Sequence, residues 1–178
     1  MKRALLPILL LAAILLAIAG LQFAQHAPRT GYSAADFSLP ALDGTTVQLA
    51  ALRGRLVFLN FWATWCPPCR EEMPGMEALY RRFAGREFSM LAVSQDEHGA
   101  ETVAPFVKEM GLTFPVLLDP EGHLPPRYGV TGYPETFLID RNGQVVHHTI
   151  GPADWNSPEM VAYIEQLLNA PASDAGQG

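Results

Sequence analysis

The chain has 178 residues, of which 49% are hydrophobic, and it carries a formal net charge of −6. This length suits one domain with extensions. The acidic balance, without a basic cluster, argues against a nucleic-acid partner. Because the chain holds two cysteines, it cannot build a disulfide framework, and the fold must depend on a hydrophobic core.

The N-terminal segment has the pattern of an export signal. Lys2 and Arg3 precede an uncharged apolar run at residues 5–21, which is the order found in secretory signals. The run approaches the ~20 residues that span a bilayer, although residues 17–19 (Ala-Ile-Ala) also offer a cleavage site within it. We therefore expect residues 1–30 to be a cleaved signal or a membrane anchor with its linker, and the following domain to be exported.

The rest of the chain alternates between strand and helix patterns. An Asp-Gly pair at residues 43–44 indicates a hairpin turn. The continuous apolar run at 56–61 indicates a strand buried on both faces. The expected elements, in chain order, are strands at 37–39, 45–49 and 56–61, a helix at 66–84, a strand at 88–93, a helix at 101–110, a strand at 114–118, a helical turn at 124–128, strands at 136–139 and 145–149, and a helix at 158–169.

This order predicts one α/β domain at residues 31–170, followed by a disordered tail at 171–178. Strands that alternate with helices imply parallel pairing through helical crossovers, and the last two strands add antiparallel pairs at one edge. Ligands of such sheets bind beyond the carboxyl ends of the strands. Cys66 follows the buried strand at this end of the sheet.

The cysteine pair, Cys66 and Cys69, allows several interpretations. A structural zinc site needs four ligands, and the adjacent His147 and His148 would point to opposite faces of a strand. A structural disulfide gains little from closing so short a loop. A Cu(I) carrier is the better metal alternative, since two thiolates suit Cu(I). We assign no metal site and no cofactor.

A redox couple explains the spacing better. Cys66 is expected at the N-cap of the helix, where the dipole and free N–H groups favour a nucleophilic thiolate, and Cys69 is the resolving thiol one turn inside. Pro67 suits the first helical position, and Pro68 withholds an N–H that often bonds the cap atom. A Cys66 thiolate with fewer N–H donors is less stabilised, so the dithiol form is less stable. This predicts a reducing couple. A dithiol oxidase is the alternative.

These residues resemble the thioredoxin superfamily. Residues 61–69 (FWATWCPPC) resemble its active-site turn from strand to helix, Pro74 matches the proline that kinks the next helix, and Pro134 matches the cis-proline that faces the dithiol. Within the superfamily, the chain is similar to the exported TlpA-like group of DsbE and ResA type. That placement depends on the export segment, the Cys-x-x-Cys-x-x-Glu pattern ending at Glu72, and YGVTGYPETFLID at 128–140.

The resemblance implies a thioredoxin-like fold with an N-terminal β-hairpin extension and a central insertion between residues 93 and 128. It also implies an exported thiol–disulfide oxidoreductase that is re-reduced by a membrane electron-donor protein. The oxidoreductase would be anchored on the periplasmic side of the inner membrane, or free in the periplasm after signal cleavage. Its substrates would be proteins with disulfides, with apocytochrome c and copper-site assembly proteins as the candidates. A redoxin-type peroxidase is disfavoured, because the Pro-x-x-x-Thr-x-x-Cys pattern is absent and Leu59 and Trp62 occupy the proline position.

The chain departs from ordinary thioredoxins at Asn60, which fills the place of a buried acid. An amide cannot accept the proton of the resolving thiol. By similarity to the TlpA-like group, Glu72, Glu135 or both are expected to tune or deprotonate Cys69. The alternatives are a solvated helix residue for Glu72 and an ordinary strand-start residue for Glu135.

The remaining aromatic, proline and histidine residues are assigned to substrate contact, to the core or to the surface. The backbone of Tyr133 would pair with an extended substrate chain, while Trp62 is expected in the core. The expected substrate-contacting residues are Trp65, Pro67, Pro68, Tyr133 and Pro134. Surface or loop positions are expected for His98, His123, His147 and His148.

Overall fold

The structure is a computed structural model that describes residues 10–11, 13–16 and 28–170. Residues 10–11 and 13–16 are helical and exposed. Most of the expected signal or anchor at 1–30, and the expected tail at 171–178, lie outside the described residues. Among the described residues, no helix is both long and apolar enough to span a bilayer.

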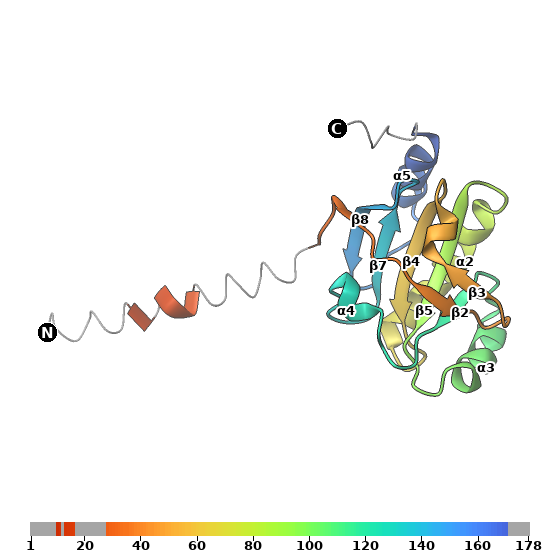
Figure 1. Cartoon of the computed structure of the whole chain (residues 1–178), viewed down its shortest axis with the longest axis horizontal. Coiled ribbons are helices and arrows are strands. Elements are labelled where there is room, and N and C mark those ends of the chain that lie inside the picture. Colours follow the sequence, from red (N-terminus) through yellow and green to blue (C-terminus); the bar gives the residue numbers. More distant parts are fainter. Residues whose placement is uncertain (1–9, 12, 17–27, 171–178) are drawn as a thin grey trace, which may run out of the picture.

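A six-stranded sheet forms the centre of the domain at residues 28–170 (Figure 1). Its order is β1-β8-β7-β4-β5-β6, in which β4, β5 and β6 are parallel while β7, β8 and β1 are antiparallel to their neighbours. The predicted mixture of parallel and antiparallel strands is therefore confirmed. The bounds are β1 Tyr32–Ser33, β4 Leu56–Trp62, β5 Phe88–Ser94, β6 Val116–Leu118, β7 Glu135–Ile139 and β8 Gln144–Ile150.

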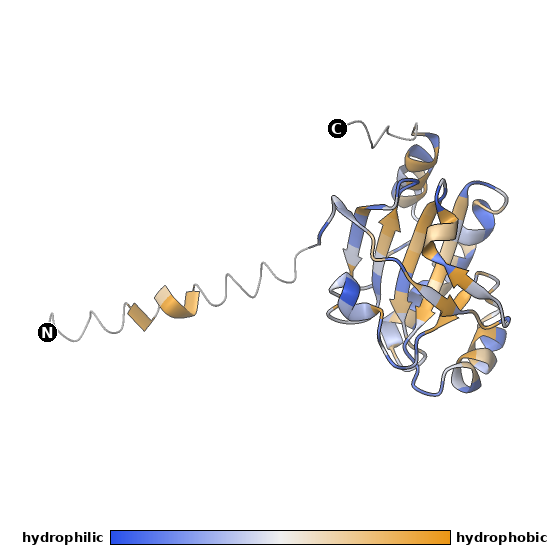
Figure 2. Ribbon diagram, in the orientation of Figure 1, coloured by the Kyte–Doolittle hydropathy of each residue, from blue (hydrophilic) through white to orange (hydrophobic). Residues whose placement is uncertain are grey.

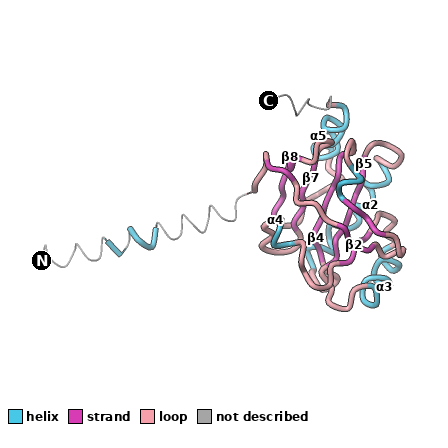
Figure 3. The backbone as a smooth tube through the Cα atoms, viewed as in Figure 1, coloured by secondary structure: helices cyan, strands magenta, loops and turns pink. Residues whose placement is uncertain are grey.

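Helices and a hairpin cover the two faces of the sheet. The helices α2, α3 and α5 contribute to the core on one face, and α4, the 3₁₀ helix η1 and the β2–β3 hairpin contribute to the core on the other. Figure 3 shows the strands running side by side between these layers. The bounds are β2 Ser38–Pro40, β3 Thr46–Gln48, η1 Leu49–Leu52, α2 Pro67–Arg82, α3 Ala100–Met110, α4 Pro125–Tyr128 and α5 Pro158–Asn169.

The central strand β4 divides its side chains between the two cores. Every residue of β4 is buried, as its apolar run predicts, and Figure 2 shows the hydrophobic colour concentrated on the central strands. Because side chains alternate along a strand, Phe58 and Trp62 lie with α2, whereas Leu59 and Phe61 face the opposite core. Trp62 is fully buried, so its expected core position is confirmed.

The segment between residues 93 and 128 contains α3, β6 and α4. It adds β6 to the sheet by parallel pairing with β5. The loop of the β2–β3 hairpin then covers the outer side of β6, because the backbone N–H of Leu42 donates to the carbonyl of Val116 at 2.9 Å and Ala41 forms a bridge with Leu117. The N-terminal hairpin and the central segment thus pack together.

Candidate redox site

Cys66 and Cys69 lie at the start of α2 and form a disulfide with an S–S distance of 2.05 Å. Cys66 is the N-cap residue, as predicted, and its Sγ accepts the backbone N–H of Cys69 at 3.3 Å. Cys66 is 3% exposed and Cys69 is fully buried. Cys66 is therefore the more exposed partner of the disulfide, and Cys69 is enclosed.

Two prolines fill the first two positions of α2 after the N-cap. Pro67 and Pro68 have no backbone N–H, so Cys69 supplies the first N–H of the helix, and that group points at the Cys66 sulfur. Pro74 lies inside the same helix, as expected.

Two aromatic side chains from distant segments meet beside the cysteines. Trp65, which directly precedes Cys66, is 65% exposed. Its ring makes an edge contact with Tyr133 at a centroid distance of 6.0 Å. The peptide bond between Tyr133 and Pro134 is cis, as the motif predicts. The ring of Tyr133 therefore lies against that of Trp65, the residue next to Cys66.

The loop before Cys66 is held by Asp96, a residue that the sequence did not single out. Asp96 is 3% exposed and accepts hydrogen bonds from the backbone N–H and hydroxyl of Thr64 and from the hydroxyl of Ser94. The signal that could have identified it is its position, just after β5 and therefore next to the end of β4. Asp96 fixes the path of the chain into the N-cap.

Glu72 is buried against the sheet, so the solvated alternative is wrong. Its Oε1 accepts the side-chain N–H of Asn60 at 3.0 Å, and its Oε2 accepts the indole N–H of Trp155 at 2.9 Å and the backbone N–H of Ala153 at 3.3 Å. Burial raises the pKa of Glu72 to about 7, against the opposing effect of these three donors. The carboxyl group can therefore exchange a proton near neutral pH.

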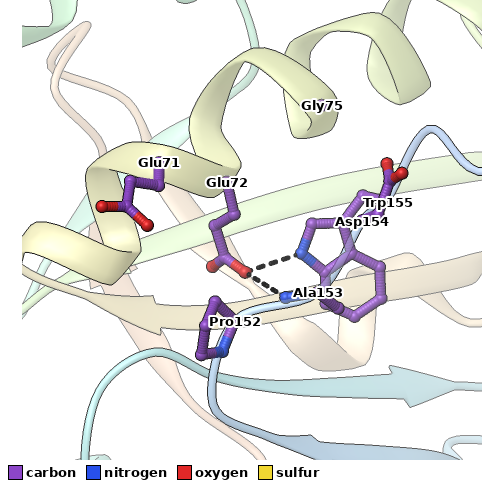
Figure 4. A pocket seen from close by; sticks show the side chains of 7 residues that line it. All are labelled: Glu71, Glu72, Gly75, Pro152, Ala153, Asp154 and Trp155. Atoms are coloured by element: carbon purple, nitrogen blue, oxygen red, sulfur yellow. Dashed lines mark hydrogen bonds between the residues drawn. The ribbon is translucent and has the colours of Figure 1, made fainter.

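A pocket of about 310 Å³ opens beside Glu72, between α2 and the loop that precedes α5. Figure 4 shows the Glu72 carboxyl pointing toward the indole of Trp155, while Glu71 points away from it. Trp155 is fully buried. Sequence reasoning did not find Trp155, because its contact with Glu72 joins positions that lie 83 residues apart. The residues that line the pocket are Glu71, Glu72, Gly75, Pro152, Ala153, Asp154 and Trp155.

Glu135 lies on the opposite face of the sheet from Glu72. In the β4–β7 register, Phe61 pairs with Glu135 and Asn60 pairs with Thr136, so Glu135 shares the face of Phe61. Glu135 is 1% exposed. The structure therefore brings Glu72, and not Glu135, onto the face where Asn60 lies beneath α2.

His148 contradicts the expected surface position. It is buried, its Nε2 lies 2.7 Å from Oε1 of Glu135, and its ring stacks on Phe137 at a centroid distance of 4.2 Å. The expectation was wrong because β8 pairs with β7 and turns His148 toward a core. His147 is half-buried against Tyr163, while His98 and His123 are exposed as expected.

Comparison with known proteins connects this geometry to a family. The profile of the AhpC/TSA family matches residues 30–148. The chain belongs to the AhpC/TSA family. It is 37% identical over 137 residues to the thiol-disulfide oxidoreductase ResA of Bacillus anthracis, covering 77% of this chain and 78% of the relative. It is 42% identical over 144 residues to ResA of Geobacillus thermodenitrificans, covering 80% and 82%.

Comparison with solved structures gives a similar result. The thiol:disulfide interchange protein DsbE of Chlorobium tepidum superposes with a TM-score of 0.68 at 36% identity, covering 79% of this chain and 95% of that chain. StoA of Bacillus subtilis superposes with a TM-score of 0.62 at 26% identity, covering 75% and 96%. This family member is a thiol–disulfide oxidoreductase of ResA and DsbE type with a thioredoxin-like fold.

Proposed function

We propose that this oxidoreductase acts mainly as a reductant of disulfides in exported proteins, with Cys66 as nucleophile and Cys69 as resolving thiol. The observation that carries the proposal is the environment of the Cys66 sulfur. It lies at a helix N-cap, accepts the N–H of Cys69 at 3.3 Å, and is followed by two residues without an N–H. This arrangement activates a thiolate while limiting its stabilisation, which favours a reducing couple.

In the proposed reaction, the reduced protein passes two electrons to its substrate. The Cys66 thiolate attacks one sulfur of a substrate disulfide, which forms a mixed disulfide and releases a substrate thiolate. Cys69 then loses its proton and attacks Sγ of Cys66. The second substrate thiolate leaves, both substrate sulfurs take up protons, and a Cys66–Cys69 disulfide remains.

Glu72 is the proposed acceptor of the Cys69 proton. It lies three residues beyond Cys69 on the same face of α2, and its pKa, raised by burial to about 7, suits proton transfer near neutral pH. Asn60 supports this role, because it donates to Glu72 from the position where ordinary thioredoxins, by resemblance, place an acid.

The substrate is proposed to bind as an extended chain between two walls of the site. The exposed ring of Trp65 offers an apolar surface beside Cys66, with Pro67 and Pro68 next to it. On the other side, the backbone of Tyr133, before Pro134, pairs with the substrate main chain. Backbone pairing explains how one site accepts partners with different side chains.

The cellular setting is proposed from the N-terminal pattern and the relatives. The basic and apolar segment at residues 1–30 would hold or direct the domain to the periplasmic side of the inner membrane. There, a membrane electron-donor protein would reduce the Cys66–Cys69 disulfide after each turnover. Apocytochrome c and copper-site assembly proteins are the proposed substrates.

Three measurements test the reductant proposal against its alternatives. The reduced protein should reduce a peptide disulfide, Cys66→Ala should abolish this activity, and Cys69→Ala should accumulate the mixed disulfide with the substrate. Retained activity in Cys66→Ala would overturn the assignment. Equilibration with glutathione should give a potential well below about −120 mV, the value of a strong oxidant; a potential near that value would instead favour the dithiol oxidase. Tight Cu(I) binding without reductase activity would favour the copper carrier.

A further inference from the structure

A continuous chain of hydrogen bonds crosses the face of the sheet opposite Glu72. The backbone N–H of Arg29 donates to Nδ1 of His148 at 2.9 Å. Nε2 of His148 lies 2.7 Å from Oε1 of Glu135. The other oxygen of Glu135 accepts the backbone N–H of Thr131 at 2.9 Å. The chain thus connects the N-terminal end of the domain to the loop that carries Tyr133.

The hydrogen-bond partners of His148 determine which of its ring nitrogens carries the proton. Because Arg29 donates to Nδ1, neutral His148 carries its proton on Nε2 and donates it to Glu135. Both carboxylate oxygens of Glu135 then accept one hydrogen bond each, from His148 and from Thr131. The stacked ring of Phe137, inclined by 16° to the imidazole, holds His148 in this orientation.

The last hydrogen bond of this series acts on a loop whose backbone makes few other hydrogen bonds to the described part of the protein, although the ring of Tyr133 packs against Trp65. Thr131 and Gly132 are exposed and Tyr133 is half-buried. Backbone hydrogen bonds lie on either side of this loop, from the N–H of Val130 to the carbonyl of Pro125 and from the N–H of Gly151 to the carbonyl of Pro134. The bond from Thr131 to a buried carboxylate therefore has a large influence on where the Tyr133 backbone points.

We propose that His148 and Glu135 are positioning residues that hold the Thr131–Pro134 loop ready to pair with a substrate chain. The inference rests on the proposed function and deepens it, because it separates the roles of the two buried acids. Glu72 lies on the face beneath α2, where Asn60 also lies. Glu135 acts through the loop backbone and specifies a polypeptide, rather than a small disulfide, as the substrate.

The test compares how the full-length protein reduces two disulfide substrates. One probe is an extended synthetic peptide with a single disulfide, and the other is hydroxyethyl disulfide, which has no main chain to pair. His148→Phe keeps an aromatic ring on Phe137 but removes both hydrogen bonds. We expect it to raise KM for the peptide about tenfold relative to KM for hydroxyethyl disulfide, with kcat for the peptide within about twofold.

A matched control comes from the neighbouring residue on the opposite face of β8. His147→Phe changes the same residue type, but His147 contacts Tyr163 and Thr149 and has no bond to the loop. We expect it to leave the ratio of the two KM values unchanged. A His148→Phe variant that changes both probes equally, or neither, would overturn the positioning role. Wild-type protein that reduces neither probe would instead overturn the proposed function.

A second variant covers the case in which His148→Phe fails to fold. In Glu135→Gln, the amide oxygen can still accept from Thr131, but its NH₂ group then faces the protonated Nε2 of His148. The imidazole must move its proton to Nδ1, against the Arg29 N–H, or the bond is lost. We expect the imidazole ¹⁵N shifts to report Nε2–H in the wild type and a changed tautomer in the variant, together with the raised peptide KM. An unchanged tautomer and peptide KM would contradict the proposal.

Discussion

The side-chain amide of Asn60 donates a hydrogen bond to Glu72 across 3.0 Å, joining the central strand to the helix that carries both cysteines. The same amide nitrogen lies 2.9 Å from the hydroxyl of Thr136 on β7. Asn60 thus links α2 and two strands around one carboxyl group. Asn60 on β4 and Glu72 on α2 together place a titratable carboxyl group between the sheet and the helix that begins at the cysteines.

The first prediction concerns the pH dependence of stability. Burial raises the pKa of Glu72 from 4.5 to about 7, so the folded state holds this proton more tightly than the unfolded state. The resulting stabilisation is fully present below about pH 4.5 and is lost as the pH rises through 7. Glu72→Gln lacks this titration. The unfolding free energy of the variant minus that of wild type should therefore rise by about 1–3 kcal/mol between pH 5 and pH 8.

Urea unfolding at both pH values measures this difference. Glu71→Gln is the matched control, because Glu71 is the exposed neighbour on the same helix and should show no such dependence. A constant difference between Glu72→Gln and wild type across the range would contradict a raised pKa for Glu72.

The second prediction concerns the two tryptophans that flank Ala63 and Thr64. Trp62 is fully buried, and its ring contacts Phe106 at a centroid distance of 5.3 Å. Trp62→Ala should therefore cost about 3–5 kcal/mol of unfolding free energy. Trp65 is exposed, so Trp65→Ala should change stability by less than about 0.5 kcal/mol while it weakens peptide binding. Denaturant unfolding and the KM for a peptide disulfide should be measured for both variants. A large loss of stability in Trp65→Ala would contradict the prediction.

The third prediction concerns the support of the loop before Cys66. Asp96→Ala removes the acceptor for the N–H and hydroxyl of Thr64 and for Ser94, and should cost about 1–3 kcal/mol. The amide hydrogen of Thr64 should exchange faster with solvent, which hydrogen exchange measures directly. Glu97→Ala, at the exposed next position, is the control. Unchanged exchange at Thr64 would show that Asp96 does not hold the loop.

The fourth prediction concerns the two prolines. Pro68→Ala restores an N–H at a helical position that commonly bonds the N-cap atom, here the Cys66 sulfur. The added donor should stabilise the reduced form and raise the potential by about 10–30 mV. Pro67→Ala restores an N–H one position earlier, which does not usually bond the cap, and should raise the potential less. Equal shifts in both variants, measured against glutathione, would refute the donor argument.

The elements that the sequence predicts well are those with local signals. The Asp-Gly turn at 43–44, the apolar run at 56–61 and the cysteine turn each specify their structure within a few residues, and the elements appear close to the expected bounds. Strand β1 was not predicted, because two residues carry no periodic pattern and its pairing with Val145 is distant in sequence.

The contacts that decide the site depend on such distant pairings. The rule that adjacent strand residues face opposite ways separates His147 from His148, but it does not say which of them faces a core. The β7–β8 register decides that His148 lies beside Phe137. In the same way, Trp155 reaches Glu72 across 83 positions of sequence. No local pattern encodes either contact.

The two edges of the sheet are unlike its interior. At one edge, β1 is a strand of two residues, and at the other, the loop of the β2–β3 hairpin bonds to Val116 and bridges Leu117. Short or covered edge strands give foreign chains little to pair with. For the proposed reductant of disulfide-containing proteins, the sheet edges would therefore not compete with the proposed pairing site at Tyr133 for a substrate main chain.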